Sequence, residues 1–125
     1  MSSQKTYTLL RHSSGTKLAL LKKASNWWSK GVGLLGQRTL EPGHGIWLPG
    51  ISSVHTVFMM FPIDIVFLGK DFKVLKIAKS VAPGSLTVRC AGAVHTIELR
   101  GGTLSDHSLA IGEICEILQG TNKDM

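Results

Sequence analysis

The longest apolar run of the chain, residues 54–68, contains only two ionisable side chains, His55 and Asp64. Pro62 divides the run into two segments of strand length. Because proline cannot donate to a sheet ladder, it is expected at an edge, a bulge or a turn. The pattern therefore predicts two buried strands that meet at a tight corner, with Asp64 just past it.

Shorter apolar segments on both sides of this run are bounded by Gly, Pro, Ser and Asn, which is typical of further strands. The predicted strands cover residues 7–11, 17–23, 46–48, 73–81, 86–89, 94–99 and 113–118. The turn signal between the first two predicts an opening hairpin. The turn that follows residue 68 predicts that segment 73–81 is the hairpin partner of the central run.

Two short helices are expected beside these strands. Residues 25–26 can cap a helix from 27 to about 35, and Thr103 or Ser105 can cap a second helix that opens at residues 103–106. The predicted fold is a single compact α+β domain made mainly of antiparallel strands. Either one mixed sheet or a small partly closed barrel satisfies the pattern.

The length agrees with one domain, because 125 residues can bury a core without disulfides or bound metals. We place the core at about residues 5–118 and a flexible tail at 119–125. A hydrophobic content of 43% and a mean hydropathy of +0.17 fit a soluble domain. The fourteen glycines favour many turns and short strands over long helices.

The net charge of +6 permits contact with polyanions, but the basic residues are dispersed along the chain. The nearest approach to a cluster is Lys73, Lys76 and Lys79. There is no run of like charges and no aromatic interleaving of the kind that binds single strands. A solvated surface is therefore favoured, and binding to nucleic acid or an anionic membrane is disfavoured.

Cys90 and Cys115 are too few for a disulfide framework and form no Cys-x-x-Cys pair, so free buried thiols are expected. The first residues include no apolar region of signal-peptide length. No segment reaches the ~20 apolar residues that cross a bilayer. The chain as given is predicted to be cytoplasmic, without a transmembrane segment.

A series of motifs resembles a known prokaryotic family, catalogued as domain of unknown function 192, over about residues 17–118. The motifs are Gly33-Leu34-Leu35-Gly36 with Arg38, then His55-Thr56-x-x-Met59-x-Phe61-Pro62-Ile63-Asp64, then Ile97-Glu98-Leu99 with Gly102-Thr103, and Ile111-Gly112-Glu113. The resemblance implies a compact α+β domain rich in antiparallel strands. It implies no activity, because the family has no settled one.

The chain departs from the family pattern at several places. Met60 stands where the family usually has a basic residue, Leu99-Arg100-Gly101-Gly102 replaces Leu-Pro-Ala-Gly, and Glu113 replaces an Asp. The loss of a cation beside Phe61 removes one candidate partner for a buried carboxylate. Many members of the family are exported, whereas this chain shows no export signal.

His55, Asp64 and Glu98 interrupt apolar strands and match family positions, so they form the candidate constellation. These residue types can form a buried polar network that fixes strand register, line a ligand pocket, or act as metal or catalytic groups. The buried network is the favoured interpretation. Asp64 is expected to have a structural role ahead of a catalytic one, with its carboxylate accepting backbone N–H groups across the corner.

We therefore expect a non-enzymatic binding module whose partner is an unknown small molecule or protein. Its predicted pocket contains Arg38, Trp47, His55, Met59, Asp64 and Glu98. One alternative is a small metal-dependent or acid/base enzyme, hydrolase-like, that uses His55, Asp64 and Glu98. A second alternative is a basic protein that contacts nucleic acid. No cofactor or metal is expected, and the oligomeric state is left open.

Overall fold

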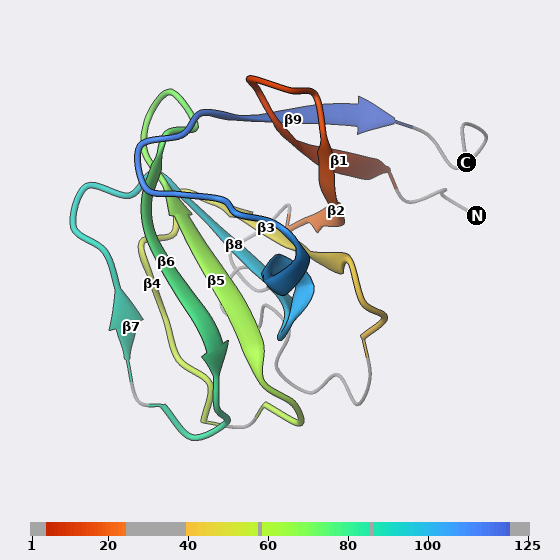
Figure 1. The fold of residues 1–125 in the computed structure, drawn as a ribbon. Helices are drawn as coiled ribbons and strands as arrows, with labels where there is room; N and C mark the ends of the chain where they lie inside the picture. Colours follow the sequence, from red (N-terminus) through yellow and green to blue (C-terminus); the bar gives the residue numbers. More distant parts are fainter. Residues whose placement is uncertain (1–4, 25–39, 58, 86, 121–125) are drawn as a thin grey trace.

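The computed structural model describes residues 5–24, 40–57, 59–85 and 87–120, and these ranges form nine strands and one short 3-10 helix (Figure 1). The strands are β1 (Thr6–Arg11), β2 (Lys17–Lys23), β3 (His44–Pro49), β4 (Ser53–Val54), β5 (Ile63–Leu68), β6 (Val74–Val81), β7 (Val88–Arg89), β8 (His95–Arg100) and β9 (Cys115–Gly120). The 3-10 helix is η1 (Thr103–Asp106). Within the described ranges, no helix is long and apolar enough to span a membrane.

Seven strands form one mixed sheet in the order β6-β5-β8-β3-β2-β1-β9. Neighbouring strands are antiparallel except β2 and β3, which run parallel. β4 and β7 pair with each other in a separate two-stranded sheet. The predicted hairpins β1–β2 and β5–β6 are both confirmed.

The two outer strands of the large sheet meet at one end. An isolated bridge joins Lys73 to Ile114, the N–H of Val74 donates to the Glu113 carbonyl at 2.8 Å, and the N–H of Cys115 donates to the Phe72 carbonyl at 2.9 Å. The sheet therefore curls until the start of β6 reaches the start of β9. The η1 turn lies in front of β5 and β8 (Figure 1).

The sheet is covered on both faces, so β5 is buried at all six positions. Side chains of a strand alternate between faces, which separates the core into two clusters. One contains Leu9, Leu18, Ala19, Leu21, Val66, Leu68, Val74, Ile97, Leu99, Leu104, Leu109 and Cys115. The other contains Met59, Ile63, Ile65 and Phe67, with partly buried side chains packed against them. Burial on both faces explains why residues 65–68 are continuously apolar instead of alternating.

The predicted α+β class is wrong for the described residues, which form an all-β domain with a lone 3-10 turn. The helix expected at 27–35 lies outside the described residues. The helix expected at 103–106 is the four-residue η1, and its N-cap is Gly102, at φ +91°, without a side-chain cap from Thr103 or Ser105. The N–H groups of Gly102 and Leu104 at its start donate to a side chain from β5, as described below, so they need no local side-chain cap.

The prediction of two buried strands in the central run is correct only for its second half. In the first half, only Val54 lies in a strand, the two-residue β4, which pairs with β7 and not with the large sheet. After Val54 the backbone turns away into a loop held by Thr56. The last strand begins at Cys115, later than expected, and includes Gln119 and Gly120.

Candidate functional site

Asp64 is 1% exposed and connects three parts of the fold. Its Oδ1 accepts the N–H of Ser80 in β6 at 2.8 Å and the N–H of Gly102 at 3.3 Å, and its Oδ2 accepts the N–H of Leu104 in η1 at 2.9 Å. Ser80 has φ +50°, an uncommon conformation for a residue other than glycine. A buried carboxylate that accepts several N–H groups offsets its loss of hydration. This geometry fits the structural role expected for Asp64.

Glu98 is also buried, at 4% exposure, but it lies on the other face of the sheet. Asp64 is opposite Leu99 in the β5–β8 pairing, whereas Glu98 is opposite Ile65 in β5 and Ile46 in β3. Directly opposed residues share a face and successive residues alternate. The sheet therefore separates the two carboxylates, and they do not form an acid/base pair.

His55 is exposed and begins a loop that is fixed by the fully buried Thr56. The Thr56 hydroxyl donates to the Ala82 carbonyl at 2.8 Å and accepts the N–H of Ser85 at 2.9 Å. The Thr56 backbone donates to Ser85 and accepts from Gly84 and Met59. Five hydrogen bonds thus tie this one residue to its surroundings, mainly the β6–β7 connection.

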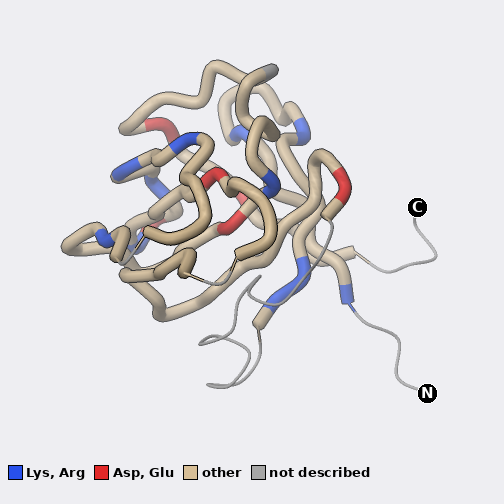
Figure 2. Tube along the Cα trace, turned by 90° about the horizontal axis from the view of Figure 1, so that it is seen from below, with Lys and Arg blue, Asp and Glu red and all other residues tan. Residues whose placement is uncertain are grey.

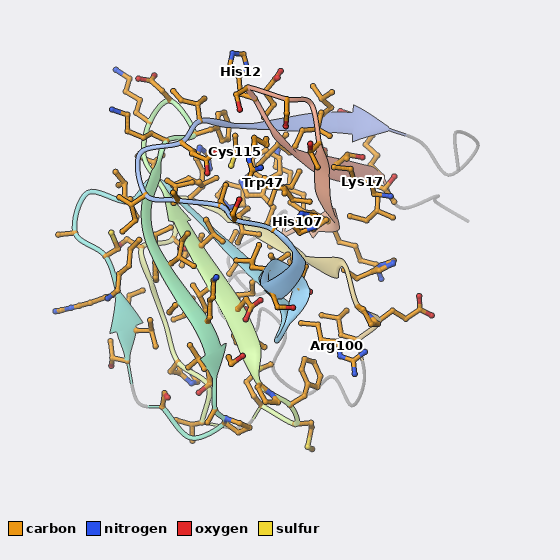
Figure 3. All side chains as sticks on the ribbon, in the orientation of Figure 1. His12, Lys17, Trp47, Arg100, His107 and Cys115 are labelled. Atoms are coloured by element: carbon orange, nitrogen blue, oxygen red, sulfur yellow. The ribbon has the colours of Figure 1, made fainter. Side chains whose placement is uncertain are left out.

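Trp47 lies on the Asp64 face, because it is opposite Ile97, which is opposite Val66. Its ring is surrounded by other groups: Tyr7 at 5.3 Å and Phe72 at 6.5 Å between centroids, and the Lys23 ammonium at 4.9 Å from the ring centre. The indole is thus engaged in packing within the fold, where Figure 3 places it near Cys115 and well away from Arg100.

The indole N–H of Trp47 also donates to Nδ1 of His95 at 3.1 Å. The imidazole stacks on Phe72, with centroids 4.7 Å apart and planes at 10°. Because Nδ1 accepts, the fold favours the neutral ring with its proton on Nε2. Burial, and secondarily the charge of Lys23, lowers the pKa of His95 below 6.5. Sequence inspection missed this pair, because the two residues are far apart in the chain and carry no spacing signal.

Met59 is buried in the second cluster, and Arg38 lies outside the described residues. The structure thus places Asp64 and Trp47 on one face, Glu98 on the other, and His55 at the surface. Within the described ranges, no three His, Cys, Asp or Glu side chains are grouped so that they could hold a metal ion. The described candidate residues are thus distributed over both faces of the sheet and the surface loop, and do not gather around one cavity.

The fold is a curled mixed β-sheet with a small two-stranded sheet beside it. Residues 9–117 match the model of the family DUF192, described as "Uncharacterized ACR, COG1430". The chain belongs to this family. None of the curated proteins compared with this chain matches it.

Two solved structures share the fold. One, from Sinorhizobium meliloti 1021, is described as a "putative transcription regulator"; it has a TM-score of 0.78 and 21% identity over 93% of this chain and 95% of that one. The other is a protein of unknown function from Novosphingobium aromaticivorans DSM 12444, with a TM-score of 0.73 and 21% identity over 89% of this chain and 83% of that one. At this level of identity, the likeness shows the fold alone.

Proposed function

We propose that this protein is a non-enzymatic binding module that contacts its partner through a preorganised loop. The loop comprises residues 55–57 and 59–61, and we call it the Thr56-anchored loop. The observation that carries the proposal is that one buried residue fixes the loop while its neighbours on both sides stay exposed. Met59 supports the loop from the second core cluster.

Two of the exposed side chains of the loop are apolar. Met60 is 62% exposed and Val57 is 37% exposed, and His55 is also exposed. Large exposed apolar side chains that lie close together are typical of contact surfaces, whereas single ones are common everywhere. A loop already held in place loses little conformational freedom on binding, so its apolar contacts add more to the affinity. This supports a partner with a small apolar recess, either a protein segment or a small molecule.

The positions of the candidate acids support binding over catalysis. A general base needs a lone pair directed at the substrate. The Asp64 oxygens instead accept three backbone N–H groups inside the fold. His55 is exposed on the loop, while Asp64 and Glu98 lie on opposite faces of the sheet. No described arrangement unites the three groups that the hydrolase-like alternative requires.

Selection from a phage-displayed peptide library on the immobilised protein tests the proposal. Selected peptides are expected to bind the wild type and to lose at least tenfold in affinity for Met60→Asp. The matched control is Ile111→Asp, which adds the same charge at a side chain of similar exposure, 68%, outside the loop. Equal losses for both variants, or a selection without enrichment, would overturn the proposal.

A further inference from the structure

The large sheet ends in two edge strands whose outer sides are protected differently. β6 contains Lys76 and Lys79, shifts register twice against β5, and is joined to β7 by the bond from the Lys76 ammonium to the Arg89 carbonyl. Lysines, bulges and covering elements are the usual devices that prevent an edge strand from pairing with another chain. β9 contains no Lys, Arg or Pro, and its six-residue register with β1 shows no shift.

The hydrogen-bond pattern determines which backbone groups of β9 face away from β1. The N–H of His12 donates to the Ile114 carbonyl at 2.9 Å. Residues along an antiparallel strand alternate between bonding to one neighbour and facing the other side. The even-numbered residues of β9 therefore bond to β1, and the odd-numbered residues face outward. The N–H of Cys115 agrees with this, because it donates to the Phe72 carbonyl on the outer side.

Beyond Cys115, the outward backbone groups belong to Ile117 and Gln119. Within the described ranges, neither residue has a hydrogen-bond partner on that side for its N–H or its carbonyl. Between them lies Leu118, whose side chain is 50% exposed. Residues 117–119, which we call the β9 edge, thus present two N–H groups, two carbonyls and one exposed apolar side chain.

We propose that the β9 edge pairs with the β9 edge of a second copy of this chain, antiparallel and about a two-fold axis at Leu118. In this register Ile117 of each copy opposes Gln119 of the other, so the free N–H and carbonyl groups of both residues are bonded across the two copies. Leu118 opposes itself in a pair without hydrogen bonds, where opposing side chains lie closest. The two large sheets then form one continuous sheet.

Charge and existing bonds disfavour the neighbouring registers. An axis at residue 116 would oppose Glu116 to its own copy, and an axis at residue 117 would need the Cys115 N–H, which already has a partner. An axis at residue 119 would oppose Leu118 to Gly120 and lose the apolar pair. With the axis at Leu118, Glu116 opposes Gly120, and its carboxylate stays with His12, 2.9 Å away. This self-complementarity favours a second copy over an unrelated strand.

The β9 edge lies at the margin of the molecule. Figure 1 shows β9 away from the small sheet of β4 and β7, and Figure 2 shows the chain that leads into the C-terminal trace in tan, the colour of uncharged residues. Among the described residues, β9 meets β6 only near its start, beside the Lys73–Ile114 bridge. The short contact predicts a weak dimer, because small interfaces are typical of transient complexes. The inference goes beyond the proposed function and uses a different surface, so each can fail without the other.

Sedimentation equilibrium of the full chain, from micromolar to millimolar concentration, tests the proposal. The wild type should follow a monomer–dimer equilibrium. Leu118→Lys places two like charges at the axis, and Gln119→Pro removes an outward N–H without removing a bond to β1. Each should raise the dissociation constant roughly tenfold or more. The matched control, Ile111→Lys, adds the same charge at a turn position that is 68% exposed, and should dimerise as the wild type does.

Engineered cysteines test the register. A pair without hydrogen bonds brings opposing Cα atoms to about 4.5 Å, which lies within the roughly 4.4–6.8 Å that a disulfide spans. In a Cys90→Ser background, Leu118→Cys should give disulfide-linked dimers under mild oxidation. Gln119→Cys is the matched control and should give few, because position 119 opposes position 117 of the other copy.

Three results would overturn the proposal. The first is a wild type that stays monomeric at millimolar concentration; if peptides from the library selection then lost affinity for Gln119→Pro, the edge would belong to a strand of another protein. The second is equal dissociation constants for Leu118→Lys and Ile111→Lys. The third is cross-linking at position 119 but not at 118. Circular dichroism of each variant excludes unfolding as the cause of a loss.

Discussion

The Asp64 carboxylate accepts the backbone N–H of Leu104 at 2.9 Å, although the two residues are forty positions apart in the chain. A residue of the central strand therefore satisfies the donor that a local cap would satisfy in an ordinary helix. The same carboxylate accepts the N–H of Ser80 at the place where the register of the β5–β6 pairing shifts. The contact thus ties together β5, the edge strand β6, and the turn that covers one core.

Replacing Asp64 with Asn should destabilise the fold. An amide keeps one oxygen, so at least one buried N–H group would face an NH₂ group in place of an acceptor. Hydrogen bonds to buried charged groups are worth about 1.5–3 kcal/mol, and we expect the free energy of unfolding in a urea melt to fall by about 2–3 kcal/mol. Asp71→Asn, at an exposed turn position, is the control and should change little. Wild-type stability in Asp64→Asn would refute the structural role.

Much of the sheet could be predicted from the sequence, because glycine, proline and polar clusters separate apolar segments of strand length. The sequence could not predict on which face of the sheet each of the two buried acids, Asp64 and Glu98, lies. Asp64 opposes Leu99, while Ile65 opposes Glu98. A register shift of one residue would exchange the faces, and no local signal in the sequence specifies that register. The expected site required Asp64 and Glu98 to lie close together, and only the register of the strand pairing decides whether they do.

The loop contacts could not be predicted for a related reason. Thr56 was one polar residue in an apolar run, and its partners Ala82 and Ser85 lie beyond β5 and β6. The helix expected at 103–106 is the four-residue η1, and the acceptor for the N–H groups at its start is Asp64, outside the local sequence. Capping rules read only neighbouring residues, whereas this cap depends on tertiary contact.

Thr56 provides a test of the loop itself. Thr56→Val retains the shape of the side chain but leaves the Ser85 N–H without its acceptor and removes the shorter of two hydrogen bonds to the Ala82 carbonyl. This should cost about 1–3 kcal/mol of stability. Hydrogen exchange should accelerate in residues 55–57 and 82–85 more than in β5. Thr56→Ser retains the hydroxyl and is the matched control. Similar exchange in the two variants would show that the hydroxyl does not anchor the loop.

The two cysteines should differ sharply in reactivity. Burial raises the pKa of Cys115 to about 11, with a further contribution from Glu113 and an opposing one from Arg11. At pH 8 only about one Cys115 in a thousand is then thiolate, and the side chain is 2% exposed. With Ellman's reagent, native protein should react at Cys90 and should react at Cys115 only after denaturation. The Cys90→Ser variant identifies the slow thiol, and rapid labelling of that native variant would contradict the burial of Cys115.

The Trp47–His95 contact should make stability depend on pH. The folded-state pKa of His95 lies below its ordinary value of 6.5 because burial and Lys23 disfavour the imidazolium. The unfolded chain therefore binds the proton more readily than the folded one. The resulting contribution to stability is present above about pH 6.5 and is lost as the pH falls through the folded-state pKa.

Protonation also turns Nδ1 into a donor that faces the indole N–H of Trp47, 3.1 Å away. Urea melts between pH 5 and 8 should show stability falling toward acid, and His95→Gln should flatten that dependence. Lys23→Gln should raise the His95 pKa toward its ordinary value, as measured by proton NMR of the imidazole, whereas Lys22→Gln should not. A His95 pKa at or above 6.5 in the wild type would contradict the buried neutral ring, because the hydrogen bond and the stacking on Phe72 both depend on it.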